Sequence, residues 1–140
     1  MTPGAADGPV AVITGAASGI GASCAGLMRR SGWRTAGLDL NPSDTDLHYV
    51  AAKGAVLGLV KSLAMEVAET AIRVNAVAPG PTDTPLLAAD SLWRKPDYLA
   101  TLPLGRLVAP EEIAHAVHYL ATEGSMYCGE VLSPNAGAVI

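Results

Sequence analysis

The sequence predicts an α/β fold with a parallel sheet, on the strength of three observations. Short apolar runs alternate with longer segments of helical character along the 140 residues. A glycine-rich turn joins the first apolar run to the first helical segment. The length also suits one domain. Because this alternation builds a parallel sheet with helices on both faces, we expect a single domain over residues 1–140.

The N-terminal part reads as a strand–helix–strand unit. Val10–Thr14 is a short apolar run ending at a glycine, as in a strand buried on both faces of a parallel sheet. A helix is expected over Gly19–Arg30, because Ser31 and Gly32 follow it as a typical helix end. Arg34–Leu40 then reads as a second strand.

Tyr49–Ala68 is expected to form a long helix with few polar positions. It follows a turn-rich stretch, residues 41–47. A helix that is apolar around most of its circumference needs cover on two sides, so one side would lie on the sheet and the other on a partner subunit. With 50% hydrophobic and 16% charged residues, we expect a homodimer or homotetramer formed through this helix.

The C-terminal half adds two strands and one helix. Residues 72–78 form an apolar run that Pro79 ends, and residues 130–133 form the last run. Pro110 and the two glutamates after it mark the start of a helix over residues 110–122. With the strands numbered along the chain, a right-handed crossover through the long helix gives about four strands in the order 2-1-3-4. A gapped sheet completed by a second chain is the alternative.

Charge and composition argue against several partners. The net charge is −4 and the basic residues are scattered, so nucleic acid is not an expected ligand. No stretch approaches the roughly 20 apolar residues of a membrane span, and no signal peptide is apparent. Cys24 and Cys128 form no CxxC pair, which suits reduced thiols in the cytoplasm. His115 and His118 have no third ligand nearby, so no metal site is predicted.

Residues 14–21, TGAASGIG, have the pattern of a phosphate-binding loop between a strand and a helix. Gly15 permits a tight turn, Gly19 lets a diphosphate approach the helix N-terminus, and Gly21 lets the helix pack on the sheet. A glycine-rich turn without a ligand is the other interpretation. Asp39 favours the phosphate-binding loop. It ends the second strand, at about the distance along the chain from the glycine motif at which a carboxylate binds an adenosine ribose. A carboxylate there repels a 2′-phosphate, so NAD is favoured over NADP.

Tyr49 and Lys53 lie four residues apart, hence on one face of the long helix. An ammonium beside a phenol favours the phenolate and lowers the phenol pKa, which suits general acid–base chemistry. Taken without context, such a pair is more often an exposed surface pair.

Together the motifs resemble the short-chain dehydrogenase/reductase family, over about 120 residues and in the family's order. They are TGAASGIG, LDLN with Asp39, YVAAK, IRVNAVAPGPTDTP and PLGRLVAPEEIAHAVHYLATEGSMYCGEVLS. The closest subgroup is that of bacterial hydroxysteroid and related carbonyl dehydrogenases. The resemblance implies a minimal Rossmann-like fold, NAD as cofactor and a small alcohol or carbonyl substrate.

The resemblance also implies roles for individual residues. Tyr49 would exchange a proton with the substrate, and Lys53 would lower the Tyr49 pKa and hold the nicotinamide ribose. Residues 86–102 match the family's substrate lid. The implied cofactor-binding residues are Thr14, Gly15, Ser18, Gly19, Ile20, Gly21, Asp39, Leu40, Lys53, Pro79, Gly80, Thr82 and Thr84.

The chain departs from the family between Asn41 and Tyr49, where about 100 residues of the doubly wound sheet are missing. The family's carbonyl-polarising Ser and relay Asn are lost with them, and neither Ser43 nor Thr45 is a clear replacement. We therefore expect a weak NAD-dependent oxidoreductase for an alcohol/carbonyl pair. The alternative is a non-catalytic relic that binds NAD or only oligomerises.

Overall fold

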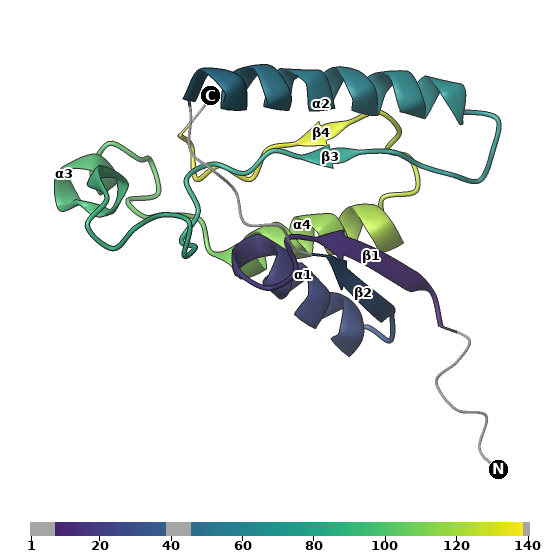
Figure 1. Cartoon of the computed structure of the whole chain (residues 1–140), viewed down its shortest axis with the longest axis horizontal. Helices are drawn as coiled ribbons and strands as arrows, with labels where there is room; N and C mark the ends of the chain where they lie inside the picture. The colour runs from purple at the N-terminus through teal and green to yellow at the C-terminus, as the bar shows by residue number, and fades with distance from the viewer. Residues whose placement is uncertain (1–7, 39–45, 139–140) are drawn as a thin grey trace, which may run out of the picture.

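The structure is a computed structural model that describes residues 8–38 and 46–138 (Figure 1). Its strands pair two by two, and both pairs are parallel. The elements are β1 (Val10–Thr14), α1 (Gly19–Arg30), β2 (Arg34–Leu38), α2 (Asp46–Glu66), β3 (Ala76–Val77), the 3-10 helix η1 (Leu92–Arg94), α3 (Pro96–Leu99), α4 (Pro110–Thr122) and β4 (Val131–Leu132). The α/β class and the helices on both faces are confirmed.

The first strand–helix–strand unit has the predicted elements, but β1 is not buried on both faces as predicted, since Val10 is 53% and Val12 is 67% exposed. Strand β1 pairs with β2 in parallel register, from Val10 opposite Arg34 to Thr14 opposite Leu38. Helix α1 has the predicted bounds, and its C-terminal Arg29 donates a 2.7 Å hydrogen bond to the Thr35 hydroxyl. This bond ties the end of the helix to the strand that follows it.

Strands β3 and β4 are shorter than the predicted runs because side-chain bonds replace part of the ladder. Asn75 donates to the Tyr127 carbonyl at 3.0 Å and accepts from the Glu130 amide at 3.0 Å. Only Ala76 and Val77 remain in regular pairing with β4. Helices α2 and α4 lie on opposite sides of this strand pair (Figure 1).

The best-buried part of the described chain is the contact between α1 and α4. Helix α1 contributes Cys24, Ala25 and Met28, each at most 7% exposed. Helix α4 contributes Ile113, which is 1% exposed, and its neighbour Ala114. Burial of these apolar side chains fixes α1 against α4, and therefore places the glycine-rich turn at the start of α1 relative to the C-terminal half.

The predicted strand order 2-1-3-4 is wrong at one join. The 2-1 and 3-4 neighbours are as predicted, but within residues 8–38 and 46–138 no ladder connects β1 with β3. The α1–α4 contact joins the two strand pairs through their helices, and no strand of the described residues pairs with both β1 and β3. The gapped arrangement is thus the one adopted, and whether a second chain completes it stays a prediction.

Helix α2 has the predicted apolar character and little cover. Ala64 is buried, and it approaches Gly129 beside β4. By contrast Leu59 is 63% exposed and Met65 is 78% exposed. The helix nevertheless falls short of a membrane-spanning segment, as do the other helices in the described part of the chain.

Candidate nucleotide-binding site

The turn between β1 and α1 has a backbone that requires glycine. Gly15 has a φ of +66° and Gly19 a φ of +50°, both in the left-handed region that favours glycine. At Gly21 a Cβ atom would run into the carbonyl oxygen of Gly15. A Cβ on Gly19 would lie 3.0 Å from the Thr84 Cγ2 atom, so the segment after β3 closes directly onto this turn.

The largest cavity described, about 750 Å³, opens at this turn. It brings the six loop positions of the sequence prediction together with Lys53 of α2 and Thr84. The loop residues in its wall are Thr14, Gly15, Ser18, Gly19, Ile20 and Gly21. Six residues of the motif thus share a cavity with two predicted residues from distant parts of the chain.

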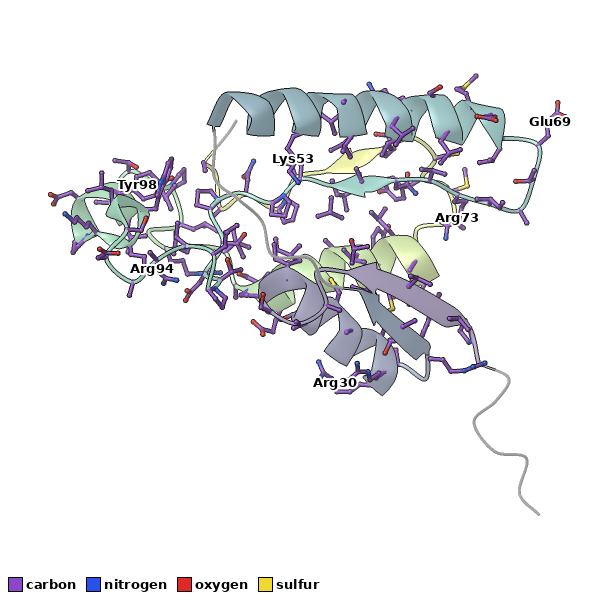
Figure 2. All side chains as sticks on the ribbon, viewed as in Figure 1. Arg30, Lys53, Glu69, Arg73, Arg94 and Tyr98 are labelled. Carbon is purple, nitrogen blue, oxygen red and sulfur yellow. The ribbon has the colours of Figure 1, made fainter. Side chains whose placement is uncertain are left out.

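A second cavity of about 540 Å³ adjoins the first, since both are lined by Ile20, Lys53, Thr84 and Leu86. Its wall also contains the predicted residues Pro79, Gly80 and Thr82, together with Pro81, Leu87 and Trp93. The Lys53 side chain leaves α2 on the side that faces this region (Figure 2).

Gly80 is needed because another backbone segment approaches it closely. A Cβ atom there would lie 2.6 Å from the Cα of Asn135, and the Gly80 amide donates a 3.1 Å bond to the Pro134 carbonyl. Thr82 donates its hydroxyl to the Gly80 carbonyl at 2.7 Å and pairs with Val108 in an isolated bridge. Asn135 was not among the predicted site residues, although the turn-forming PNAG stretch around it was a usable signal.

The predicted reactive pair lies on α2. Tyr49 falls in the first turn of the helix and Lys53 one turn later, as the spacing predicted. Lys53 is exposed to solvent, and it lines both cavities. The Tyr49 side chain lies outside what the structure describes, as do Asp39 and Leu40.

The cavity walls suit an anionic ligand. Among the described residues lining the 750 Å³ cavity there is no carboxylate, and the charged residue is Lys53. Cys24 also reaches this cavity, but burial raises the pKa of its thiol, so the neutral thiol is favoured.

These features fit the dinucleotide that the motif predicts. The Ser18 side chain makes no capping hydrogen bond, so it leaves the N–H groups of the first turn of α1 available to an anion. No atom lies within 4 Å of where a Gly15 Cβ would stand, which leaves the turn open. The volume also lies in the range of about 300–1,000 Å³ typical of ligand pockets.

Comparison with known proteins gives consistent matches to oxidoreductases. A family model described as enoyl-(acyl carrier protein) reductase matches residues 42–138. A 3-oxoacyl-[acyl-carrier-protein] reductase of Chlamydia trachomatis is 43% identical over 102 residues, which are 72% of this chain and 40% of that protein. A 3alpha-hydroxysteroid dehydrogenase of Mediterraneibacter gnavus is 48% identical over 91 residues, 64% of this chain and 36% of that protein.

The chain therefore spans less than half of the length of these curated relatives. Its fold is similar to that of solved dehydrogenases. A 4-hydroxyisoleucine dehydrogenase in complex with NADH superposes with a TM-score of 0.77, over 92% of this chain and 98% of that chain. The sequence identity of this pair is 17%, so the likeness concerns the fold.

Proposed function

Because the chain belongs to the short-chain dehydrogenase/reductase family, we propose that it is an NAD(H)-dependent oxidoreductase with Tyr49 as general acid and base. Its substrate would be an alcohol or the corresponding ketone or aldehyde. The relatives named above are a reductase and a dehydrogenase, which supports this reaction class. The observation that carries the proposal is the shared cavity of the glycine-rich turn, Lys53 and Thr84.

The cofactor's diphosphate would lie at the N-terminus of α1. Its anionic oxygens would accept hydrogen bonds from the first-turn N–H groups, next to the positive end of the helix dipole. Thr84, which lines the same cavity, would add a further hydrogen-bond donor through its hydroxyl. Pro79, Gly80 and Thr82 would border the nicotinamide end in the adjoining cavity.

The two residues of α2 would handle the proton. When bound, NAD(H) supplies or accepts the hydride. In the reducing direction the Tyr49 phenol would donate its proton to the substrate oxygen, and in the oxidising direction the phenolate would take it back. Lys53, one helical turn away, would stabilise the phenolate by its charge and hold the ribose by hydrogen bonding.

The choice of NAD over NADP rests on Asp39. A carboxylate at the end of the second strand accepts hydrogen bonds from ribose hydroxyls and repels the extra phosphate of NADP.

A second candidate function is binding of NAD without catalysis, or oligomerisation alone. The gap between β1 and β3 favours it, because the missing middle of the family fold would carry the carbonyl-polarising Ser and the relay Asn. Removing one such oxyanion donor typically lowers the rate by about 10² to 10³. Turnover therefore separates catalysis from binding of NAD alone, and cofactor affinity separates both of these from oligomerisation alone.

We further propose that copies of the chain associate through the Tyr49–Ala68 helix. Along α2 the exposed apolar side chains include Val56, Leu59 and Met65. A second copy would cover this surface, giving a homodimer or homotetramer. Multi-angle light scattering at micromolar concentration should report at least a dimer, and a stable monomer would contradict the proposal.

Calorimetric titration with NADH, followed by turnover assays, tests the proposed function. The wild type should bind NADH and should oxidise it in the presence of at least one member of a panel of ketones and aldehydes. Tyr49→Phe should abolish turnover with little change in NADH affinity, because it removes the transferable proton. Lys53→Ala should weaken both. Equal turnover by wild type and Tyr49→Phe would show that the turnover does not use Tyr49, and would favour NAD binding as the function. Absence of NADH binding would reject both the NAD(H)-dependent oxidoreductase and the non-catalytic NAD-binding protein.

A further inference from the structure

Arg94 lies in the segment that matches the family's lid, residues 86–102, and contacts residues 83–84 just before the lid as well as residues 87–88 within it. Its guanidinium forms a 2.6 Å ion pair with the Asp83 carboxylate. It also donates to three backbone carbonyl oxygens: Thr84 at 3.2 Å, Leu87 at 3.0 Å and Ala88 at 3.2 Å. This one side chain of η1 thus contacts a carboxylate and three carbonyl groups, all within residues 83–88.

The same segment is held on its other side by backbone pairing. The Asp83 amide donates to the Val108 carbonyl at 2.9 Å, and the Val108 amide donates to the Pro81 carbonyl at 2.9 Å. After Asp83 this pairing ends, and Arg94 supplies the next contacts along the chain. Thr84 lies at this transition, so its position depends on the arginine more than on the pairing.

Thr84 is the residue of this segment that meets the nucleotide turn. Its side chain stands 3.0 Å from where a Cβ on Gly19 would be, and it lines both cavities. Its carbonyl oxygen is one of the acceptors of Arg94. A chain of direct contacts therefore runs from the lid through Arg94 and Thr84 to the N-terminus of α1.

We propose that Arg94 is a positioning residue that holds Thr84 against the glycine-rich turn and so couples the lid to binding of the cofactor's diphosphate. The ligand in this inference rests on the proposed function. Neither the motifs quoted for the family nor the predicted site residues include Arg94. The planar guanidinium suits the task because it can serve several acceptors in fixed directions, which a lysine ammonium at this place would not.

The contacts of Arg94 differ from those of an ordinary exposed ion pair. Its side chain is 27% exposed, whereas Arg106, which forms a 2.7 Å pair with Glu112, is 52% exposed. Arg106 also contacts neither Thr84 nor the segment 83–88 in the interactions described. Arg106→Met is therefore a matched control for Arg94→Met, since each change removes one arginine–carboxylate pair.

Hydrogen exchange of the ligand-free full chain measures the positioning directly. In Arg94→Met the amide of Leu87, which bonds the Thr84 carbonyl at 3.0 Å, should exchange faster than in wild type. Amides of α4 should keep their wild-type rates, which shows that the chain still folds. Arg106→Met should leave the Leu87 rate unchanged. Equal Leu87 rates in wild type and Arg94→Met would overturn the inference.

Titration with NADH and with adenosine then tests the coupling to the diphosphate. Arg94→Met should weaken NADH binding about tenfold, the scale of one lost hydrogen bond to a charged group. Binding of adenosine, which lacks a diphosphate, should not change, and Arg94→Lys should not restore NADH affinity. Wild-type NADH affinity in Arg94→Met would overturn the coupling. Absence of NADH binding in the wild type would instead reject the proposed function, and the exchange rates would still decide the positioning.

Discussion

Replacing Gly19 by alanine tests the geometry on which the nucleotide site depends. Two separate effects should destabilise the variant. The φ of +50° is unfavourable for a residue with a Cβ, at a cost of about 1–2 kcal/mol. The new Cβ would also stand 3.0 Å from the Thr84 Cγ2 atom, which must move. Crowding of this kind costs about 1 kcal/mol or more, so the total loss should be about 2–3 kcal/mol.

Gly15→Ala provides the matched control. Gly15 has a similar φ of +66°, but no atom lies within 4 Å of the position of its Cβ. Its variant should therefore lose only the conformational part, about 1–2 kcal/mol. The difference between the two variants isolates the contact with Thr84.

Urea denaturation of both variants, and of Gly19→Ala combined with Thr84→Ser, measures these effects. The serine removes the Cγ2 methyl, so the double variant should recover part of the stability that Gly19→Ala loses beyond Gly15→Ala. NADH titration should show weaker binding for Gly19→Ala than for Gly15→Ala. Equal free energies of unfolding for the two single variants would refute the close approach of Thr84 to the turn, and no recovery in the double variant would assign the crowding to the Thr84 Cβ, 3.1 Å away, rather than to its methyl.

The remaining predictions concern cofactor choice, rate and pH. Asp39→Ala should reduce the preference for NADH over NADPH in parallel titrations, since it removes the carboxylate that repels a 2′-phosphate; an unchanged ratio would remove Asp39 from the site. Turnover on a ketone should lie about 10² or more below that of an intact relative under the same conditions, because the Ser donor is missing; comparable rates would mean that the site has another donor. Hydrogen bonding from Arg106 and from the Ala109 amide lowers the Glu112 pKa to about 2. This contribution to stability is present above the unfolded pKa of about 4.5 and is lost as the pH falls towards 2. Glu112→Gln should therefore be less stable than wild type at pH 6 and equal to it near pH 2, and a gap that does not change with pH would contradict this.

The sequence predicted the local elements well where a single local signal was decisive. The apolar run ending at Gly15 and the typical helix end after Arg30 gave β1 and α1 with their observed bounds. Pro110 and its glutamates gave the start of α4. The family inferred from the motifs is confirmed by the match over residues 42–138.

Strand lengths were predicted less well because they depend on neighbours. The run over residues 72–78 suggested a full strand, but Asn75 bonds the chain near β4 through its side chain and leaves two residues in regular pairing. A hydrophobic pattern predicts that a segment packs against others. It does not show which of its backbone groups find a partner, since that depends on the adjacent segment.

The sequence by itself determined the family, the longer helices and the places of the strands, because these follow from short-range patterns such as glycine spacing and helix signals, whereas the short helices η1 and α3 were not predicted. Only the tertiary structure decided that β1 and β3 stand apart, that Thr84 closes onto Gly19, and that Arg94 holds the segment between them. The physical reason is that packing acts between residues far apart in the chain. The buried contact between α1 and α4 joins helices from opposite ends of the chain, and no local pattern in either helix encodes that contact.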